Sequence, residues 1–275
     1  MKGDPTSTLP ELTTMAHQID GTASLEQLAT TIGSTVSVLT KYLQEKNLPQ
    51  PSFLPDGPTD FPSEAPLKVA SARVDLVTAA RQLYFLALWP RESVQWNLAH
   101  HHHDSSSTRW LYHFNIFRAV PLEGTIAIST LAAQTRLDED RLTRILRHAM
   151  TNHLFTEPEE GQVAHTAQSA LLAKDVALSS LVGHCTEELF PASAKLVEAT
   201  SRVDEPKTRP AFNIAFDTDL DAMAFIGKDP FRSERFAESM KGMIHSEPWN
   251  ISHVVTGYDW EALGEAVVVD VSANS

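Results

Sequence analysis

The sequence predicts a mainly α-helical protein, and three patterns support this prediction. Apolar residues recur at steps of three and four over 25–43, and a second helical pattern covers 68–96. Residues from about 110 to 174 then predict helices followed by two strands. One β-branched run, at 266–270, has the composition of a buried strand. Helices therefore account for most of the predicted structure.

The first helical part is followed by a proline-rich connector. The apolar residues of this first helical part are spaced for one bent helix or a helix pair: Leu25, Leu28, Ile32, Val36, Leu39 and Leu43. Six of the sixteen prolines then fall between Leu48 and Pro66. Proline fixes φ and lacks an N–H, so this connector can hold neither a helix nor a central strand. We expect it to extend along a surface.

The pattern becomes helical again from Lys68 to about Trp96. Its apolar coverage is too wide for a helix with one face in water, and includes Val69, Val74, Val77, Ala80, Leu83, Phe85, Leu86 and Leu88. Such breadth predicts helix packed against helix, including contacts between subunits.

The order of elements from about Trp110 to Lys174 predicts a winged helix. Residues 125–135 predict a short helix, and Asp138 can cap a second one. The second helix carries Leu142, Ile145, Leu146 and Met150 on one face. Residues 155–165 predict a hairpin with its turn at 159–161.

Winged helices often bind DNA, but the charge of this chain argues against that function. The chain has 22 Lys and Arg against 35 Asp and Glu, a formal charge of −13, and no basic stripe to neutralise phosphates. The arginines of the second predicted helix are offset by acidic residues at Asp138, Glu139, Asp140, Glu157, Glu159 and Glu160. We expect no nucleic-acid partner, and a DNA-binding regulator is the least favoured alternative.

The last residues, Glu265-Ala-Val-Val-Val-Asp270, resemble the first strand of a Rossmann-like sheet. Such a sheet needs further strands and helices after it, so we expect the nucleotide-binding domain to be incomplete in this chain. The apolar stretches are shorter than about 18 residues, and no secretory signal opens the sequence. A single cysteine, Cys185, fits a reducing compartment. We expect a cytoplasmic protein with no membrane partner.

Few side chains form a pattern typical of catalysis. The run His100-His101-His102-His103 cannot converge on one ion, because consecutive helical residues point about 100° apart, so we expect no metal site. His184 and Glu187 could form an acid–base pair or a surface ion pair. A soft, aromatic-rich set could wall a cavity for a flat organic molecule or simply form core: Met223, Phe225, Phe231, Phe236, Met240 and Met243.

Across essentially the whole chain, the order of parts resembles the fungal branch of small-molecule O-methyltransferases, relatives of the caffeate and flavonoid enzymes. The most specific segments are Phe212-Asn-Ile-Ala-Phe216, Gly227-Lys-Asp-Pro230 and Arg235-Phe-Ala-Glu-Ser-Met240. Ala266-Val-Val-Val-Asp270 follows at the distance expected for this family. Leu142-Thr-Arg-Ile-Leu-Arg-His148 supports the resemblance in the winged-helix part.

The resemblance implies a dimer and a methyl-transfer reaction. S-adenosylmethionine would donate the methyl group to a phenol or enol hydroxyl of an aromatic or polyketide-like acceptor, in fungal secondary metabolism. It implies that Met240 walls the acceptor, with Met223, Phe225 and His184 along the same pocket. The family's catalytic His is expected beyond the end of this chain, so no catalytic residue is assigned.

The resemblance breaks down at the carboxyl end. Asp270 is followed by Val271-Ser-Ala-Asn-Ser275 in place of the family's glycine-rich loop. No cofactor-binding residue is therefore assigned. We expect this chain alone to bind no cofactor and to be inactive. Alternatives are a non-catalytic partner that dimerises with an intact relative, and a pericyclase-like pseudo-methyltransferase that binds a small organic molecule.

With the resemblance included, the sequence predicts five parts. They are N-terminal helices (1–46), a proline-rich connector (47–67), dimerisation helices with the winged helix (68–175), substrate-side helices (176–264) and the first strand of a truncated cofactor domain (265–275).

Overall fold

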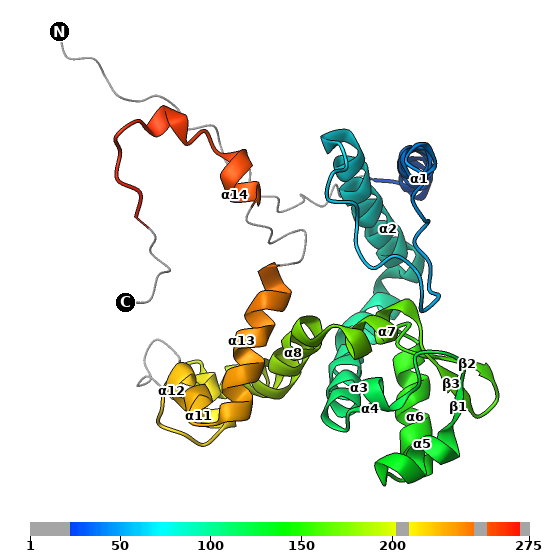
Figure 1. Cartoon of the computed structure of the whole chain (residues 1–275), viewed down its shortest axis with the longest axis vertical. Helices are drawn as coiled ribbons and strands as arrows, with labels where there is room; N and C mark the ends of the chain where they lie inside the picture. Colours follow the sequence, from blue (N-terminus) through cyan, green and yellow to red (C-terminus); the bar gives the residue numbers. More distant parts are fainter. Residues whose placement is uncertain (1–22, 202–208, 245–251, 270–275) are drawn as a thin grey trace. The chain divides into compact units, whose positions relative to one another are not determined.

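The computed structural model describes residues 23–201, 209–244 and 252–269 (Figure 1). Within these ranges the backbone is mostly helical and forms one small three-stranded sheet. The described residues divide into two compact units. The first contains residues 23–47 and 65–94, and the second contains residues 48–64 with those from 95 onward.

The first unit is a pair of packed helices, α1 (Leu25–Glu45) and α2 (Leu67–Ser93). Helix α1 begins with a capping box, in which the side chains of Ser24 and Gln27 each accept a hydrogen bond from the other's backbone N–H. The buried residues of α1 are spaced at intervals of seven: Leu28, Thr35 and Tyr42. One stripe of α1 is therefore covered, but it shares only Leu28 with the predicted apolar set, of which Leu25 and Val36 are exposed.

Helix α2 contains a sharp break near its end. Trp89 has φ 58° and ψ 160°, and Pro90 follows it. Proline cannot donate the helical hydrogen bond and disfavours helical backbone in the residue before it, which explains the break. A π-helical segment, η1 (Val94–Ala99), comes next. The helical pattern expected from 68 to 96 is therefore interrupted at this dipeptide.

The main apolar core of the second unit lies among the elements between residues 101 and 174. In chain order these are α3 (His101–His113), α4 (Ile116–Ala119), β1 (Ile126–Ala127), α5 (Ile128–Thr135), α6 (Glu139–Met150), β2 (Thr156–Glu159), β3 (Gln162–Ala164) and α7 (Ala167–Lys174). Asp138 caps α6 by accepting from the Arg141 N–H at 2.9 Å. The core is formed by side chains that include Leu111, Ile116, Leu131, Leu142, Leu146, Phe155 and Val163.

The sheet has the order β1-β3-β2, and both pairings are antiparallel. Gly161 lies in the turn between β2 and β3 with φ +77°, a conformation that favours glycine. Arg147 of α6 donates two hydrogen bonds to Glu157 of β2, each 2.8 Å long. This bond to Arg147, with a second bond from the Gly161 N–H, lowers the pKa of Glu157 to about 2. The hairpin is thus attached to α6 by a charged pair.

The proline-rich connector lies on the second unit. The Phe53 carbonyl accepts from the Ala167 N–H at 3.0 Å, where α7 begins. The Phe53 ring stacks on His153 with centroids 4.3 Å apart. These contacts agree with the extended surface path expected for this segment.

The rest of the second unit is built from short helices around one longer pair. They are α8 (Val176–His184), η2 (Cys185–Leu189), α9 (Phe190–Ser193), α10 (Leu196–Ala199), α11 (Ala211–Ala215), α12 (Ala222–Gly227), α13 (Pro230–Ile244), α14 (Ser252–Gly257) and η4 (Glu261–Leu263). Helices α8 and α13 lie side by side (Figure 1). A Cβ on Gly242 would lie 2.6 Å from the Ala177 carbonyl oxygen, so the close approach of these helices depends on glycine.

Residues 266–269, where the sequence predicts a strand, have no regular secondary structure. Their three valines are exposed, Val267 to 88%. A strand needs a hydrogen-bonded neighbour, and the sheet of the described residues does not include this segment. Asp270 lies outside the described residues. Among the described helices, none has the length and apolar character needed to cross a membrane.

Candidate functional site

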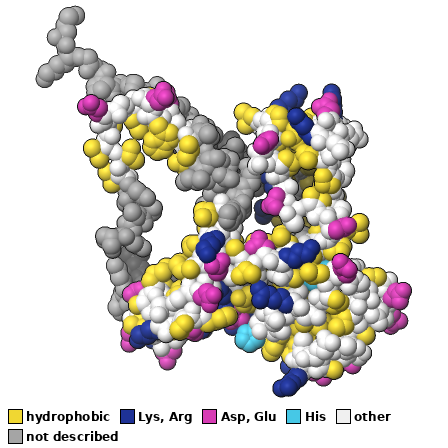
Figure 2. Space-filling view, in the orientation of Figure 1, with side chains coloured by type: hydrophobic (Ala, Val, Ile, Leu, Met, Phe, Trp, Pro, Cys, Tyr) yellow, Lys and Arg dark blue, Asp and Glu magenta, His cyan; other side chains and the backbone are white. Residues whose placement is uncertain are grey.

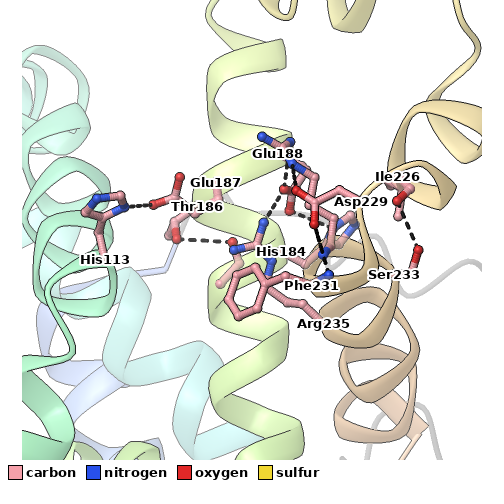
Figure 3. Close-up of polar contacts among 12 residues, drawn as sticks. His113, His184, Thr186, Glu187, Glu188, Ile226, Asp229, Phe231, Ser233 and Arg235 are labelled. Atoms are coloured by element: carbon pink, nitrogen blue, oxygen red, sulfur yellow. Dashed lines mark hydrogen bonds and ion pairs between the residues drawn. The ribbon is translucent and has the colours of Figure 1, made fainter.

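A buried carboxylate, Glu188, lies at the centre of a polar network between η2 and α13 (Figure 3). It is 1% exposed. One of its oxygens, Oε1, accepts from the guanidinium of Arg235 and from Arg232 Nη1, the latter at 3.2 Å. The other oxygen, Oε2, lies 3.3 Å from His184 Nδ1. A buried charge requires such partners, so this network fixes the position of α13 against η2.

The aromatic rings of α13 pack around the same network. His184 meets the Phe236 ring edge to face, with centroids 5.2 Å apart. The guanidinium of Arg235 lies 5.2 Å from the centroid of Phe231. Arg235 is 7% exposed, and its Nε–H is buried with no acceptor in the described part of the chain. One strong donor of this network is therefore unused.

The neighbouring carboxylate, Glu187, faces the other way. Figure 3 shows it directed toward His113, on the opposite side of η2 from Arg235. Its oxygens lie 3.2 Å from Arg109 Nη2 and 3.1 Å from His113 Nδ1. Burial disfavours the charged form of Glu187, but the hydrogen bonds and charges of Arg109 and His113 outweigh it, and the pKa is lowered. Glu187 therefore links η2 to α3 as an ionised group.

A cavity of about 680 Å³ lies beside this network. Its walls come from α3, the α3–α4 turn, α4, α8, η2 and the first two turns of α13. They are formed by Tyr112, His113, Asn115, Phe117, Arg118, Val176, Ser179, Ser180, Glu187, Asp229, Phe231, Arg232, Glu234, Arg235 and Glu238. The cavity thus combines aromatic surface with guanidinium, hydroxyl and carboxylate groups.

A second hollow of about 410 Å³ lies beside the aromatic cluster of α11 and α12. Phe216 and Phe225 line it, and the Arg232 guanidinium lies 5.3 and 5.0 Å from their ring centroids. Because Arg232 also pairs with Glu188, it connects this aromatic cluster to the buried network.

Neither of these two cavities is lined by more than one of the four residues predicted to line an acceptor pocket. Phe225 lines the second hollow, and His184 is buried against Glu188 and Phe236. Met240 is half-buried on α13, and Met223 on α12 is 54% exposed. None of the four lines the larger cavity. Asp270, predicted to end the cofactor-domain strand, lies outside the described residues.

The other sequence candidates are also placed. His184 pairs with Glu188, four residues later, which is the ordinary spacing of neighbours on a helical face. Glu187 instead contacts Arg109 and His113. Cys185 is an exposed free cysteine. Among the described residues no His, Cys, Asp and Glu group is arranged to hold a metal ion.

No sequence motif identifies Glu188, Arg232 and Arg235 as a unit. One signal was available, because Asp229, Arg232 and Arg235 are spaced at three residues on one helical face. The carboxylate that both arginines contact, Glu188, is on another helix more than forty residues earlier. No local pattern identifies such a contact.

Comparison with known proteins shows which sequences and structures this chain is similar to. Residues 96–175 match the O-methyltransferase dimerisation domain. The chain is 36% identical over 253 residues to O-methyltransferase bik3 of Gibberella fujikuroi, covering 91% of this chain and 56% of that protein. The chain is a relative of the fungal O-methyltransferases. It is also 36% identical to the chlorophenol O-methyltransferase of Trichoderma longibrachiatum, over 84% of this chain and 50% of that one.

These fungal O-methyltransferase relatives are longer than the chain, which spans little more than half of their length. Solved structures share the fold. OxaC in complex with sinefungin and meleagrin aligns with a TM-score of 0.60 at 17% identity, over 85% of this chain and 53% of that one. A pericyclic reaction enzyme aligns with a TM-score of 0.52 at 17% identity, over 76% and 49%.

Proposed function

We propose that this chain is part of an enzyme of fungal secondary metabolism that methylates a phenol or enol hydroxyl of an aromatic or polyketide-like acceptor. The observation that carries the proposal is the 36% identity with O-methyltransferase bik3 over 253 residues. Fold alone does not choose this reaction, because a pericyclic reaction enzyme has a similar fold. Sequence identity favours methyl transfer over a pericyclase-like function.

The methyl donor in this proposal is S-adenosylmethionine, but the described residues do not fit it. A nucleotide-like cofactor binds at the carboxyl ends of parallel strands, next to a helix N-terminus. The sheet of the described residues has three short antiparallel strands. We therefore infer that other residues of the enzyme hold the donor, and no step of the reaction is assigned to the residues described.

The role proposed for this chain is assembly and acceptor binding. The winged-helix part would serve self-association, in a homodimer or in a heterodimer with an intact relative. Exposed apolar side chains within the matched segment support this role: Trp96, Leu98, Phe114 and Leu122. The helices that carry Met240, Met223, Phe225 and His184 would contact the acceptor.

Calorimetry with S-adenosylmethionine tests the inference about the donor. The isolated chain should give no saturable heat, since its described residues lack a cradle for the cofactor. Saturable binding with a Kd of about 1–100 μM would contradict this inference. The proposal that the helices of this chain contact the acceptor is tested separately.

A chimaera tests the reaction itself. This chain would be joined to the part of the Trichoderma chlorophenol O-methyltransferase that it does not match, and assayed with S-adenosylmethionine and a panel of phenols. We expect methylated product, and we expect Met240→Ala to lower kcat/KM more than Lys241→Ala, because Met240 is the residue proposed to wall the acceptor. A folded chimaera that transfers no methyl group to any phenol would overturn the proposed function.

A further inference from the structure

The larger cavity has the dimensions and walls of a small-molecule site. Its volume of about 680 Å³ lies within the range of about 300–1,000 Å³ typical of ligand pockets. Phe231 is 63% exposed although it lines the cavity, so a broad apolar ring is available for contact. Tyr112 and the hydroxyls of Ser179 and Ser180 add hydrogen-bonding groups.

Most of the acidic groups around the cavity are already neutralised. Glu187 pairs with Arg109 and His113, Asp229 pairs with Arg232, and Glu238 pairs with Lys241. Glu234 is the lining carboxylate for which the described residues supply no cation. Among the carboxylates that line the cavity, Glu234 therefore carries the one negative charge that no described cation offsets, and its side chain is exposed.

One basic side chain at the cavity has no carboxylate partner among the described residues. Arg118 of α4 is exposed at the cavity and forms no ion pair with any described carboxylate. The Nε–H of Arg235 is buried without an acceptor among the described residues. That nitrogen has almost no accessible surface, so a ligand in the cavity would meet the guanidinium of Arg118 and not this N–H.

The cavity is on a different side of α13 from Met240. Phe231, Glu234, Arg235 and Glu238 follow the spacing of three and four that places residues on one helical face. Met240 comes two residues after Glu238, which is about 200° around the helix axis. A ligand in this cavity would therefore not occupy the acceptor position proposed at Met240.

We propose that this cavity binds an aromatic carboxylate, as a second small-molecule site. The ring contacts Phe231 and Tyr112, and the carboxylate pairs with the exposed guanidinium of Arg118. Charged hydrogen bonds of this kind offset the loss of water around the anion. The acidic groups nearby favour a monoanion over a phosphate dianion, because each extra negative charge adds repulsion from Glu234.

Titration of the chain with 2-naphthoate tests the proposal, with 2-naphthalenemethanol as the uncharged analogue and 2-naphthyl phosphate as the dianion. We expect saturable binding of the carboxylate, weaker binding of the phosphate, and at least tenfold weaker binding of the alcohol, corresponding to one charged hydrogen bond. Binding of all three with equal affinity would show that the anion is not recognised, and absence of binding at millimolar concentration would reject the site.

Paired variants locate the site. Arg118→Gln should raise the Kd for 2-naphthoate about tenfold, whereas Glu234→Gln should lower it, because one removes attraction and the other repulsion. Arg141→Gln, which changes an exposed arginine on α6, is the matched control and should leave the Kd unchanged. Arg235 is left intact because it also holds Glu188. Equal Kd values in Arg118→Gln, Glu234→Gln and the parent chain would overturn the proposal.

Discussion

His165 is a buried histidine held by two hydrogen bonds. Its Nε2 lies 3.1 Å from the Val120 carbonyl oxygen and its Nδ1 lies 2.9 Å from Ser169 Oγ. A neutral ring satisfies both, with Nε2 donating and Nδ1 accepting. Burial lowers the pKa of His165 below its ordinary 6.5 and outweighs the opposing bond to Val120. The ring is therefore neutral in the folded protein at pH values where it would be charged in the unfolded chain.

This difference predicts acid sensitivity. As the pH falls below 6.5, the unfolded chain gains a proton at His165 that the folded protein does not bind, so the free energy of unfolding decreases until the lowered pKa is passed. One such group contributes at most about 1.4 kcal/mol per pH unit. Urea denaturation between pH 7.5 and 5.5 should show a smaller loss of stability in His165→Gln than in the parent chain. The exposed His101→Gln serves as control, and an unchanged slope in His165→Gln would refute the assignment.

At the scale of helices, the α8–α13 pair depends on one glycine. A Cβ on Gly242 would meet the Ala177 carbonyl, which is backbone and cannot rotate away. Gly33 in the middle of α1 has nothing within 4 Å of the same position. The two residues are therefore a matched pair of helical glycines in opposite surroundings.

The pair predicts stability changes of opposite sign. Gly242→Ala should lower the free energy of unfolding by about 1–3 kcal/mol, since the helices must move apart. Gly33→Ala should raise it by about 0.5–1 kcal/mol, because alanine favours the helix. Thermal and urea unfolding of both variants measure these changes. A stabilising Gly242→Ala would mean that α8 and α13 do not approach as closely as the structure has them.

The helices could be predicted from sequence where their signals are local. The existence of helix α1 and the Asp138 cap of α6 follow from patterns within one turn or one face, and both are observed. The face of α1 that is buried differs from the predicted one, because Thr35 and Tyr42 are covered while Leu25 and Val36 are exposed. The break at Trp89 is signalled by Pro90, but the broad apolar pattern on both sides of this proline favours one continuous helix. The Glu188 network could not be foreseen, since it joins side chains separated by more than forty residues. The acceptor residues came from resemblance and remain a proposal.

At the scale of the whole molecule, the exposed surface is a mixture of charged and hydrophobic side chains. Figure 2 shows basic, acidic and apolar groups interspersed on the visible face. Within the segment that matches the dimerisation domain, Leu98 is 75% exposed and Trp96 is 60% exposed. Large apolar side chains exposed in this way are typical of surfaces that contact another protein.

Self-association should therefore depend on these side chains. Light scattering of the chain at about 50 μM, well above the micromolar Kd of a modest interface, should give twice the 30.3 kDa mass of one copy. Leu98→Asp should shift the mass toward one copy, because the dimer would bury an unpaired charge. Leu196→Asp changes a leucine that is 63% exposed outside the matched segment, and should leave the mass unchanged. A single-copy mass for the parent chain would rule out self-association at this concentration.

The consecutive glutamates of η2 have one more consequence. Glu187 is attached to cations of α3, and Glu188 to cations of α13. Turning η2 about its own axis would stretch one set of ion pairs or the other, whichever the direction. The ion pairs therefore restrain η2 against rotation about its axis in both directions. Through η2 they also restrain the orientation of α3 relative to α13, although these helices are far apart along the chain.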